Sequence, residues 1–303
     1  MGNWSRRRWM ATGIAGSAAV AGTVWTFRSR SATGPSEVRI AVEGDRRVVT
    51  SNGLPGHATG DFPNRHDPVS LRVQSHRFEM PSRPEVAAQA TALGFWNFGV
   101  AINGVPFDPS GPFWDGDAKS GWQFEVMCPP NALALGIDVN HAHTQGRGVY
   151  HYHGLPTALV WDARSAAPEA PMHLIGFAGD GFPIYAPDAP GTAEDLASPV
   201  RRLRSSWRLR LGKRSGGPGG AFDGTFVEDF EYRPGSGDLD ECNGRVGPTP
   251  EFPDGIYHYV LTDEFPFIPR SFRGRPDPSF RHGPPPGVSP PVPSELRRYR
   301  PKV

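Results

Sequence analysis

Short runs of alternating apolar and polar residues, separated by turn residues, make up most of this chain. Residues 34–55 form a strand pattern, a Gly44-Asp45 turn and a second strand pattern, and residues 69–81 alternate as a half-buried strand does. Asn103-Gly104 interrupts another apolar run and indicates a hairpin turn. Segments 157–163, 173–187, 224–234 and 255–269 continue this pattern, so we expect strands there too.

Helical periodicity is weak by comparison. Residues 83–94 predict one or two helical turns, and residues 191–212 are the best helix candidate. Strands and helices do not alternate as they do in parallel α/β folds. The pattern predicts a mainly β fold over residues 36–272, an irregular sandwich or barrel of many short antiparallel strands with one or two short helices. Residues 273–303 are rich in proline and predict an extended or disordered tail.

The composition is consistent with frequent turns and argues against a nucleic-acid partner. The 303 residues include 37 Gly and 34 Pro, both well above average usage. The formal net charge is +1, but residues 1–30 hold five arginines and no acidic residue. Without residues 1–30, the chain has 27 basic and 31 acidic side chains. The folded part therefore lacks the basic excess of a nucleic-acid-binding protein, and we expect no nucleic acid partner.

The N-terminus has the features of an export signal. Residues 5–9, Ser-Arg-Arg-Arg-Trp, precede an 18-residue apolar run, 10–27, that is rich in Gly and Ala. The order of residues resembles the twin-arginine type of signal. Residues 1–30 are interpreted either as a cleaved signal or as a retained N-terminal anchor that associates the protein with the envelope. Either interpretation predicts a periplasmic or secreted bacterial protein.

The two cysteines suit such a compartment. Outside the cytoplasm an even number of cysteines usually indicates a disulfide, which predicts a bond between Cys128 and Cys242. The alternative, a cysteine-ligated metal, is disfavoured because neither cysteine lies in a C-x-x-C spacing.

A Tyr-His-Tyr pattern occurs twice and is the strongest chemical signal in the chain. In the first copy, residues 150–153, the side chains of His151 and His153 share one face of a strand and the tyrosines share the other. The second copy, residues 257–259, offers His258. If the two strands pair or face each other, His258 becomes a third ligand. Three neutral imidazoles favour Cu, Zn, Fe or Ni over Ca or Mg.

Histidines also gather just before the first copy. His141 and His143 lie within ten residues of the His-x-His pair and are further candidate ligands. We expect the isolated histidines, such as His57 and His282, to make ordinary hydrogen bonds instead. The tyrosines are interpreted either as core residues or as groups whose hydroxyls hold the ligands in place.

Several blocks resemble the YHYH family of exported bacterial proteins. They are GVYHYHGLP (148–156), IGFAGDGFPIYAP (175–187), LDECNGR (239–245) and GIYHYVLTDEFPFIPRSFRG (255–274), and NGVPFDP and GWQFEVM also fit. The resemblance covers about residues 52–274 and implies export and a metal site. It places the following residues in the family's motifs: Tyr150, His151, Tyr152, His153, Asp180, Asp240, Cys242, Tyr257 and His258.

The resemblance also sets the expected roles. It implies cofactor contacts from Tyr150, Tyr152, Asp180 and Tyr257. This chain departs from the family pattern at His141, where we expect Asn, and at Ser271, where we expect Cys. The first departure weakens His141 as a ligand and the second weakens the pairing of Cys242.

Three functions remain open at this point. The first is an exported metal-binding protein, with copper favoured and zinc or iron as alternatives. The second is a metal-dependent hydrolase or oxidase of the cell envelope, and the third is a surface module that binds glycan or wall polymer through Trp and Tyr. The chain has no G-x-S-x-G, H-E-x-x-H or phosphate-loop motif, so enzymatic activity is left undecided.

Overall fold

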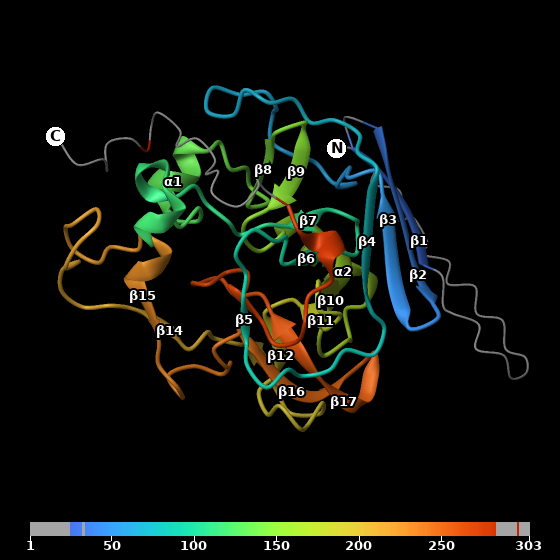
Figure 1. The fold of residues 1–303 in the computed structure, drawn as a ribbon. Coiled ribbons are helices and arrows are strands. Elements are labelled where there is room, and N and C mark those ends of the chain that lie inside the picture. Colours follow the sequence, from blue (N-terminus) through green and yellow to red (C-terminus); the bar gives the residue numbers. More distant parts are fainter. Residues whose placement is uncertain (1–24, 32–33, 283–295, 297–303) are drawn as a thin grey trace, which may run out of the picture.

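A four-stranded antiparallel sheet is built by the first part of the chain. The computed structural model describes residues 25–31, 34–282 and 296, and this sheet has the strand order β1-β2-β3-β4 (Figure 1). The predicted hairpin at Gly44-Asp45 is confirmed, since β2 and β3 pair from Val38–Ser51 to Glu43–Arg46. The strands are β1 (Trp25–Ser31), β2 (Gly34–Glu43), β3 (Arg46–Ser51) and β4 (His76–Pro81).

An eight-stranded mixed sheet forms the centre of the molecule. Its order is β16-β17-β11-β10-β6-β7-β9-β8, and only the β11–β17 and β7–β9 pairs are parallel. The Asn103-Gly104 hairpin is confirmed between β6 and β7. The strands are β6 (Gly99–Ala101), β7 (Pro106–Phe107), β8 (Ala142–Gln145), β9 (Val149–Tyr152), β10 (Leu174–Ala178), β11 (Pro183–Tyr185), β16 (Gly244–Thr249) and β17 (Phe252–Val260).

Small sheets and short helices complete the described chain. The strand pairs are β12 (Asp188–Pro190) with β13 (Val200–Arg202), β14 (Trp207–Leu209) with β15 (Phe230–Tyr232), and β18 (Ser271–Phe272) with β5 (Thr91–Ala92). The α-helices are α1 (Pro129–Ala134) and α2 (Thr157–Ala166), and the 3₁₀ helices are η1 (Trp114–Gly116), η2 (Ala118–Ser120), η3 (Val227–Asp229) and η4 (Pro278–Phe280).

Three local predictions are wrong. The helical turns expected over residues 83–94 are absent, and the only regular element that the structure describes in this segment is the short strand β5. The helix expected over 191–212 is absent, and β13 and β14 lie there instead. The strand expected over 157–163 is helix α2, which buries Leu159 and Val160 and leaves Trp161 71% exposed. A strand buries alternate residues, whereas two adjacent buried residues followed by an exposed one fit a helix with a narrow apolar face.

The two large sheets pack face to face, as the predicted sandwich requires. Val38, Ile40 and Phe78 of the first sheet form one buried cluster with Val100 and Phe177 of the second. The main core lies on the other side of the central sheet, where the Phe98 ring contacts the rings of Tyr259 and Phe272. Among the described residues no sheet closes into a barrel.

The segment after β18 packs onto the sandwich. Phe280 is buried, and its ring stacks on Phe78 with 4.8 Å between centroids. Backbone hydrogen bonds join Asn97 to Phe280 and His282 to Phe95. Well-packed chain therefore continues past residue 273, where the predicted tail begins; residues 283–295 and 297–303 lie outside the described part.

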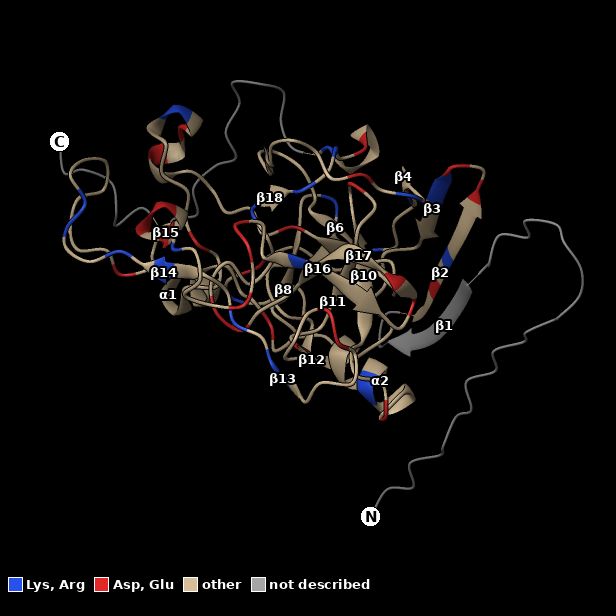
Figure 2. Cartoon of the chain, turned by 90° about the horizontal axis from the view of Figure 1, so that it is seen from below, with Lys and Arg blue, Asp and Glu red and all other residues tan. Residues whose placement is uncertain are grey.

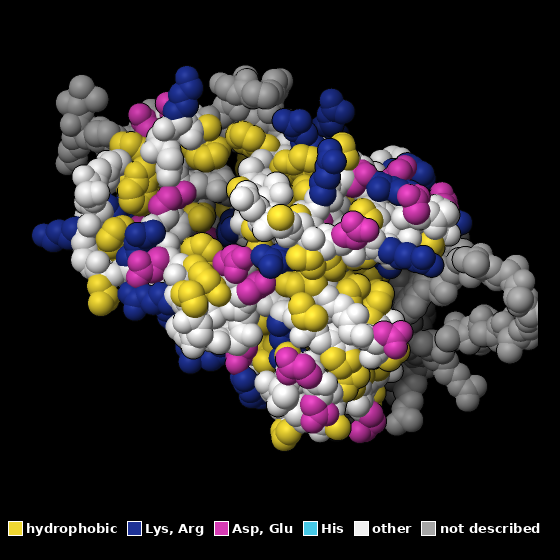
Figure 3. Space-filling model, turned by 60° about the horizontal axis from the view of Figure 1, so that its bottom comes forward, with side chains coloured by type: hydrophobic (Ala, Val, Ile, Leu, Met, Phe, Trp, Pro, Cys, Tyr) yellow, Lys and Arg dark blue, Asp and Glu magenta, His cyan; other side chains and the backbone are white. Residues whose placement is uncertain are grey.

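Charges of both signs are dispersed over the surface. Figure 2 shows basic and acidic residues interspersed along the loops, and on the face in Figure 3 they alternate with apolar patches. Within the described part of the chain, no helix is long and apolar enough to cross a membrane. Residues 1–24, which carry most of the predicted export signal, lie outside the described residues.

Candidate metal site

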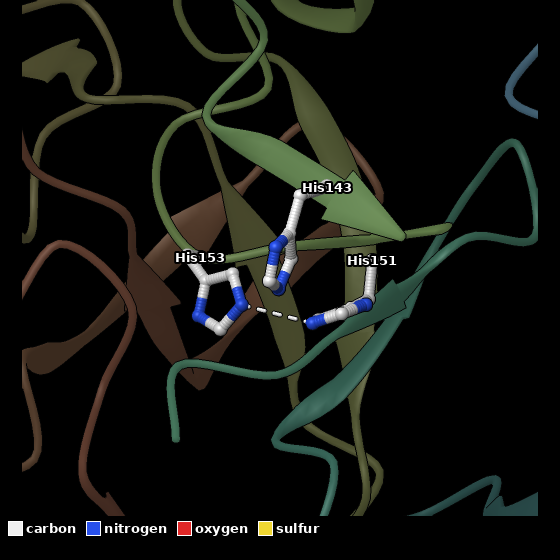
Figure 4. Close-up of side chains that lie close together, drawn as sticks. All are labelled: His143, His151 and His153. Atoms are coloured by element: carbon white, nitrogen blue, oxygen red, sulfur yellow. Dashed lines mark hydrogen bonds between the residues drawn. The ribbon is translucent and has the colours of Figure 1, made fainter. Parts of the chain in front are cut away.

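The β8–β9 hairpin brings three histidines together. His143 on β8 lies directly opposite His151 on β9, so both side chains point to the same face of the sheet. His153 lies two residues beyond His151 and points to that face as well (Figure 4). One ring nitrogen from each residue lies within 4.8 Å of the others, which makes this set a candidate metal site among the described residues.

Hydrogen bonds to the backbone fix the orientation of two of the rings. His143 Nδ1 lies 2.7 Å from the carbonyl oxygen of Leu135, and His151 Nδ1 lies 3.1 Å from that of Val149. A carbonyl oxygen only accepts, so each Nδ1 carries the proton and each Nε2 keeps a free lone pair. This is the arrangement in which histidine ligates a metal through Nε2.

The ring of His153 bonds to another histidine instead of to the backbone. His153 Nε2 lies 2.8 Å from His151 Nε2, and because His151 Nε2 can only accept, His153 Nε2 donates. His153 Nδ1 is then buried without a hydrogen-bond partner. An ion bound here would take the place of the shared proton, and the unpartnered Nδ1 would receive a proton. The donor set therefore fits a transition metal.

Burial keeps all three rings neutral. His151 and His153 are 1% and 2% exposed. Burial, reinforced by the neighbouring histidine, lowers the pKa of His151 to about 3. Burial likewise lowers the pKa of His153 well below its usual value and lowers that of His143. Neutral imidazole is the form that binds metal, so the site is ready for an ion at neutral pH.

The chain was compared with models of known protein families. A family model described as YHYH protein matches residues 77–274, which is more than half of the chain. The chain belongs to the YHYH family. Neither curated proteins nor solved structures gave a match. In this YHYH protein the naming motif supplies two of the three clustered histidines, and His143 supplies the third from the neighbouring strand.

The tyrosines of the motif lie on the opposite face of β9. The Tyr152 hydroxyl donates to His57 Nε2 at 2.6 Å and accepts from Asn103 at 2.9 Å. The Tyr150 hydroxyl donates to Asp138 Oδ2 at 2.7 Å. Both rings are buried in the main core. In this YHYH protein the two tyrosines therefore lie on the face of β9 that points away from the three clustered histidines.

The structure does not bring His258 to the other three histidines. Strand β17, which carries it, is separated from β9 by β11, β10, β6 and β7. At about 4.8 Å per strand, this is about 24 Å along the sheet, and Figure 1 shows the two strands at opposite ends of the molecule. His258 instead bonds to the carbonyl of Ile256 and accepts from Arg245 Nε at 3.4 Å. The two Tyr-His-Tyr strands belong to one sheet without pairing or facing each other.

Other residues implied by the family motifs lie apart from the histidine cluster. His141 does not belong to the set of three clustered histidines, and its Nδ1 lies 2.8 Å from the carbonyl oxygen of Leu155. Asp180 accepts from the Tyr259 hydroxyl and from Gly274 N. The Tyr257 hydroxyl donates to Asp240 at 3.0 Å. These side chains therefore lie outside the set of three clustered histidines.

The predicted disulfide is absent. Both cysteines are free, with Cys242 buried in the main core and Cys128 at the N-terminal cap of α1. Burial raises the pKa of the Cys242 thiol to about 12, which disfavours the thiolate needed for oxidation. The sequence evidence for pairing was an even number of cysteines behind a predicted export signal, and this carries no information on the distance between the two cysteines.

Proposed function

We propose that this YHYH protein is an exported metal-binding protein that holds a single transition-metal ion with His143, His151 and His153. The observation that carries the proposal is the convergence of three buried imidazoles on one face of the β8–β9 hairpin. Metal–nitrogen bonds of about 2.0–2.1 Å place two ligands of a tetrahedral ion about 3.4 Å apart. The two Nε2 atoms now 2.8 Å apart would therefore separate by about half an ångström.

The donor set supports a particular group of ions. Imidazole nitrogen is a borderline ligand that suits Cu, Zn, Fe and Ni, and the usual order of stability favours Cu²⁺. The proposed ion is therefore copper, with zinc or iron as alternatives. Export is part of the proposal; it is supported by the sequence of residues 1–27 and by the family resemblance, and cell fractionation tests it.

Elemental analysis of the purified, reconstituted protein tests the metal site. We expect about one equivalent of bound ion in the wild type and loss of binding in His143→Gln, His151→Gln and His153→Gln. His258→Gln is the matched control, because it changes a buried histidine in the same Tyr-His-Tyr context. Its metal content should equal that of the wild type. Retention of metal by all three cluster variants, or no binding by the wild type, would refute the proposal.

A further inference from the structure

A buried carboxylate lies on the same face as the three histidines. Asp108 follows β7, and its backbone N–H bonds to the carbonyl of Tyr152. Phe107 is the register partner of Tyr152, so the side chain of Asp108, one residue on, points to the face that carries His151 and His153. Asp108 is 2% exposed. The histidine pattern in the sequence gave no sign of it, although it lies within the NGVPFDP block.

Asp108 is held as an anion. Its Oδ1 accepts from Ser110 N at 3.0 Å, and its Oδ2 accepts from Gln145 Nε2 at 3.4 Å. Burial alone would raise the pKa of Asp108, but His282 beside it holds the pKa well below its usual value. A buried carboxylate is costly unless a positive charge offsets it. The neutral cluster does not provide one.

His282 supplies the positive charge in the metal-free protein. Its Nε2 lies 3.2 Å from Asp108 Oδ2. Burial would lower the pKa of His282, but the carboxylate of Asp108 outweighs this and raises it. His282 reaches this position because the segment after β18 packs onto the sandwich and its backbone bonds to Phe95. The anion beside the histidine cluster is thus paired with a cation from the C-terminal segment.

We infer that Asp108 is the electrostatic counter-charge of the metal site and that His282 competes with the ion for it. The inference rests on the proposed metal site and concerns which charges tune its affinity. Three neutral imidazoles leave the full charge of an ion uncompensated, so a nearby carboxylate stabilises the bound state. Conversely, an imidazolium beside that carboxylate repels the ion. Asp108 and His282 are positioning residues, since neither belongs to the ligand set.

The two residues should change affinity in opposite directions. Mutation of an outer-shell group that supports a metal site typically costs about 10–100-fold in metal affinity. We expect Asp108→Asn to weaken Zn²⁺ binding by this factor. His282→Gln should strengthen it severalfold, because it removes a positive charge and leaves the backbone bond to Phe95 in place. A purely structural role predicts weaker binding in both variants.

A second readout isolates the charge. Coulomb energy scales with the charge of the ion, so the logarithm of the loss caused by Asp108→Asn should be about twice as large for Zn²⁺ as for Cu⁺. If the substitution instead loosened the ligands, it would weaken the binding of both ions without this twofold difference between them. Asn can still accept from Ser110 and can donate to a neutral His282, so we expect the variant to fold; its urea midpoint verifies this.

The experiment measures dissociation constants for Zn²⁺ and for Cu⁺ by competition with chromophoric chelators, with oxygen excluded for Cu⁺. It is carried out at about pH 6, because the raised pKa of His282 keeps this residue charged there. Asp162→Asn, an exposed carboxylate on α2, is the control and should bind as the wild type does. Unchanged Zn²⁺ affinity in folded Asp108→Asn, or weaker binding in His282→Gln, would overturn the inference. Failure of the wild type to bind either ion would refute the metal site itself.

Discussion

His258, the histidine of the second Tyr-His-Tyr strand, should make the protein sensitive to acid. Its side chain has no exposed surface. Burial lowers the pKa of His258 to about 4, helped by the Arg245 guanidinium and only partly opposed by the hydrogen bond to Ile256. In the unfolded chain the same group should titrate near its ordinary value of about 6.5. The folded state therefore binds this proton less tightly than the unfolded state does.

The sign and size of the effect follow from proton linkage. Between about pH 6.5 and pH 4 the unfolded chain holds a proton on residue 258 and the folded chain does not. Stability is therefore fully present above about pH 6.5 and is lost as the pH falls toward 4. The difference between the two pKa values corresponds to about 3 kcal/mol of unfolding free energy.

Urea unfolding of the metal-free protein at several pH values measures this loss. Other buried histidines also contribute to the acid sensitivity of the wild type, so the informative quantity is the difference from variants that cannot titrate at 258. His258→Gln keeps an acceptor for Arg245, and His258→Phe keeps a ring against Tyr185. Both should lose about 3 kcal/mol less than the wild type between pH 7 and pH 4. Parallel stability curves would show that His258 is not held neutral by the fold.

Three further outcomes test other parts of the structure. Tyr152→Phe should cost about 1–3 kcal/mol in urea unfolding, because it leaves Nε2 of the buried His57 without its hydrogen-bond donor, yet change metal affinity less than about threefold. Arg270→Ala should destabilise the protein by about 3–5 kcal/mol, because it leaves the carboxylate of Glu125, which is 1% exposed, without its ion-pair partner. The double substitution Arg270→Met with Glu125→Leu should recover much of this loss. Thiol titration of the denatured, unreduced protein should find both Cys128 and Cys242 reactive.

Local patterns predicted the parts of the site that depend on neighbouring residues. Alternation alone placed His151 and His153 on one face, because a strand has a period of two. His143 was a candidate by proximity in sequence, and the β8–β9 register aligns it with His151. The Gly44-Asp45 and Asn103-Gly104 hairpins were predictable for the same reason, since turn residues act over a few positions.

Strand order was not predictable from those patterns. Two similar strands suggested a shared site for His258, yet β17 pairs with β16 and β11, far from β9 in the sheet. Long-range neighbours depend on the packing of the whole sandwich, which no short motif encodes. Asp108 and His282 were missed for the same reason, since 174 residues separate them in the chain and only the fold brings them together.

The resemblance between the two strands is therefore explained by their tyrosines rather than by their histidines. All four hydroxyls donate, from inside the main core, to a carboxylate or an imidazole: Tyr150 to Asp138, Tyr152 to His57, Tyr257 to Asp240 and Tyr259 to Asp180. A buried phenol needs such a partner, and alternation then places the histidine on the other face. That face meets two more histidines in the first copy and an arginine in the second. The same motif thus anchors both strands, and only the first one contributes histidines to the proposed metal site.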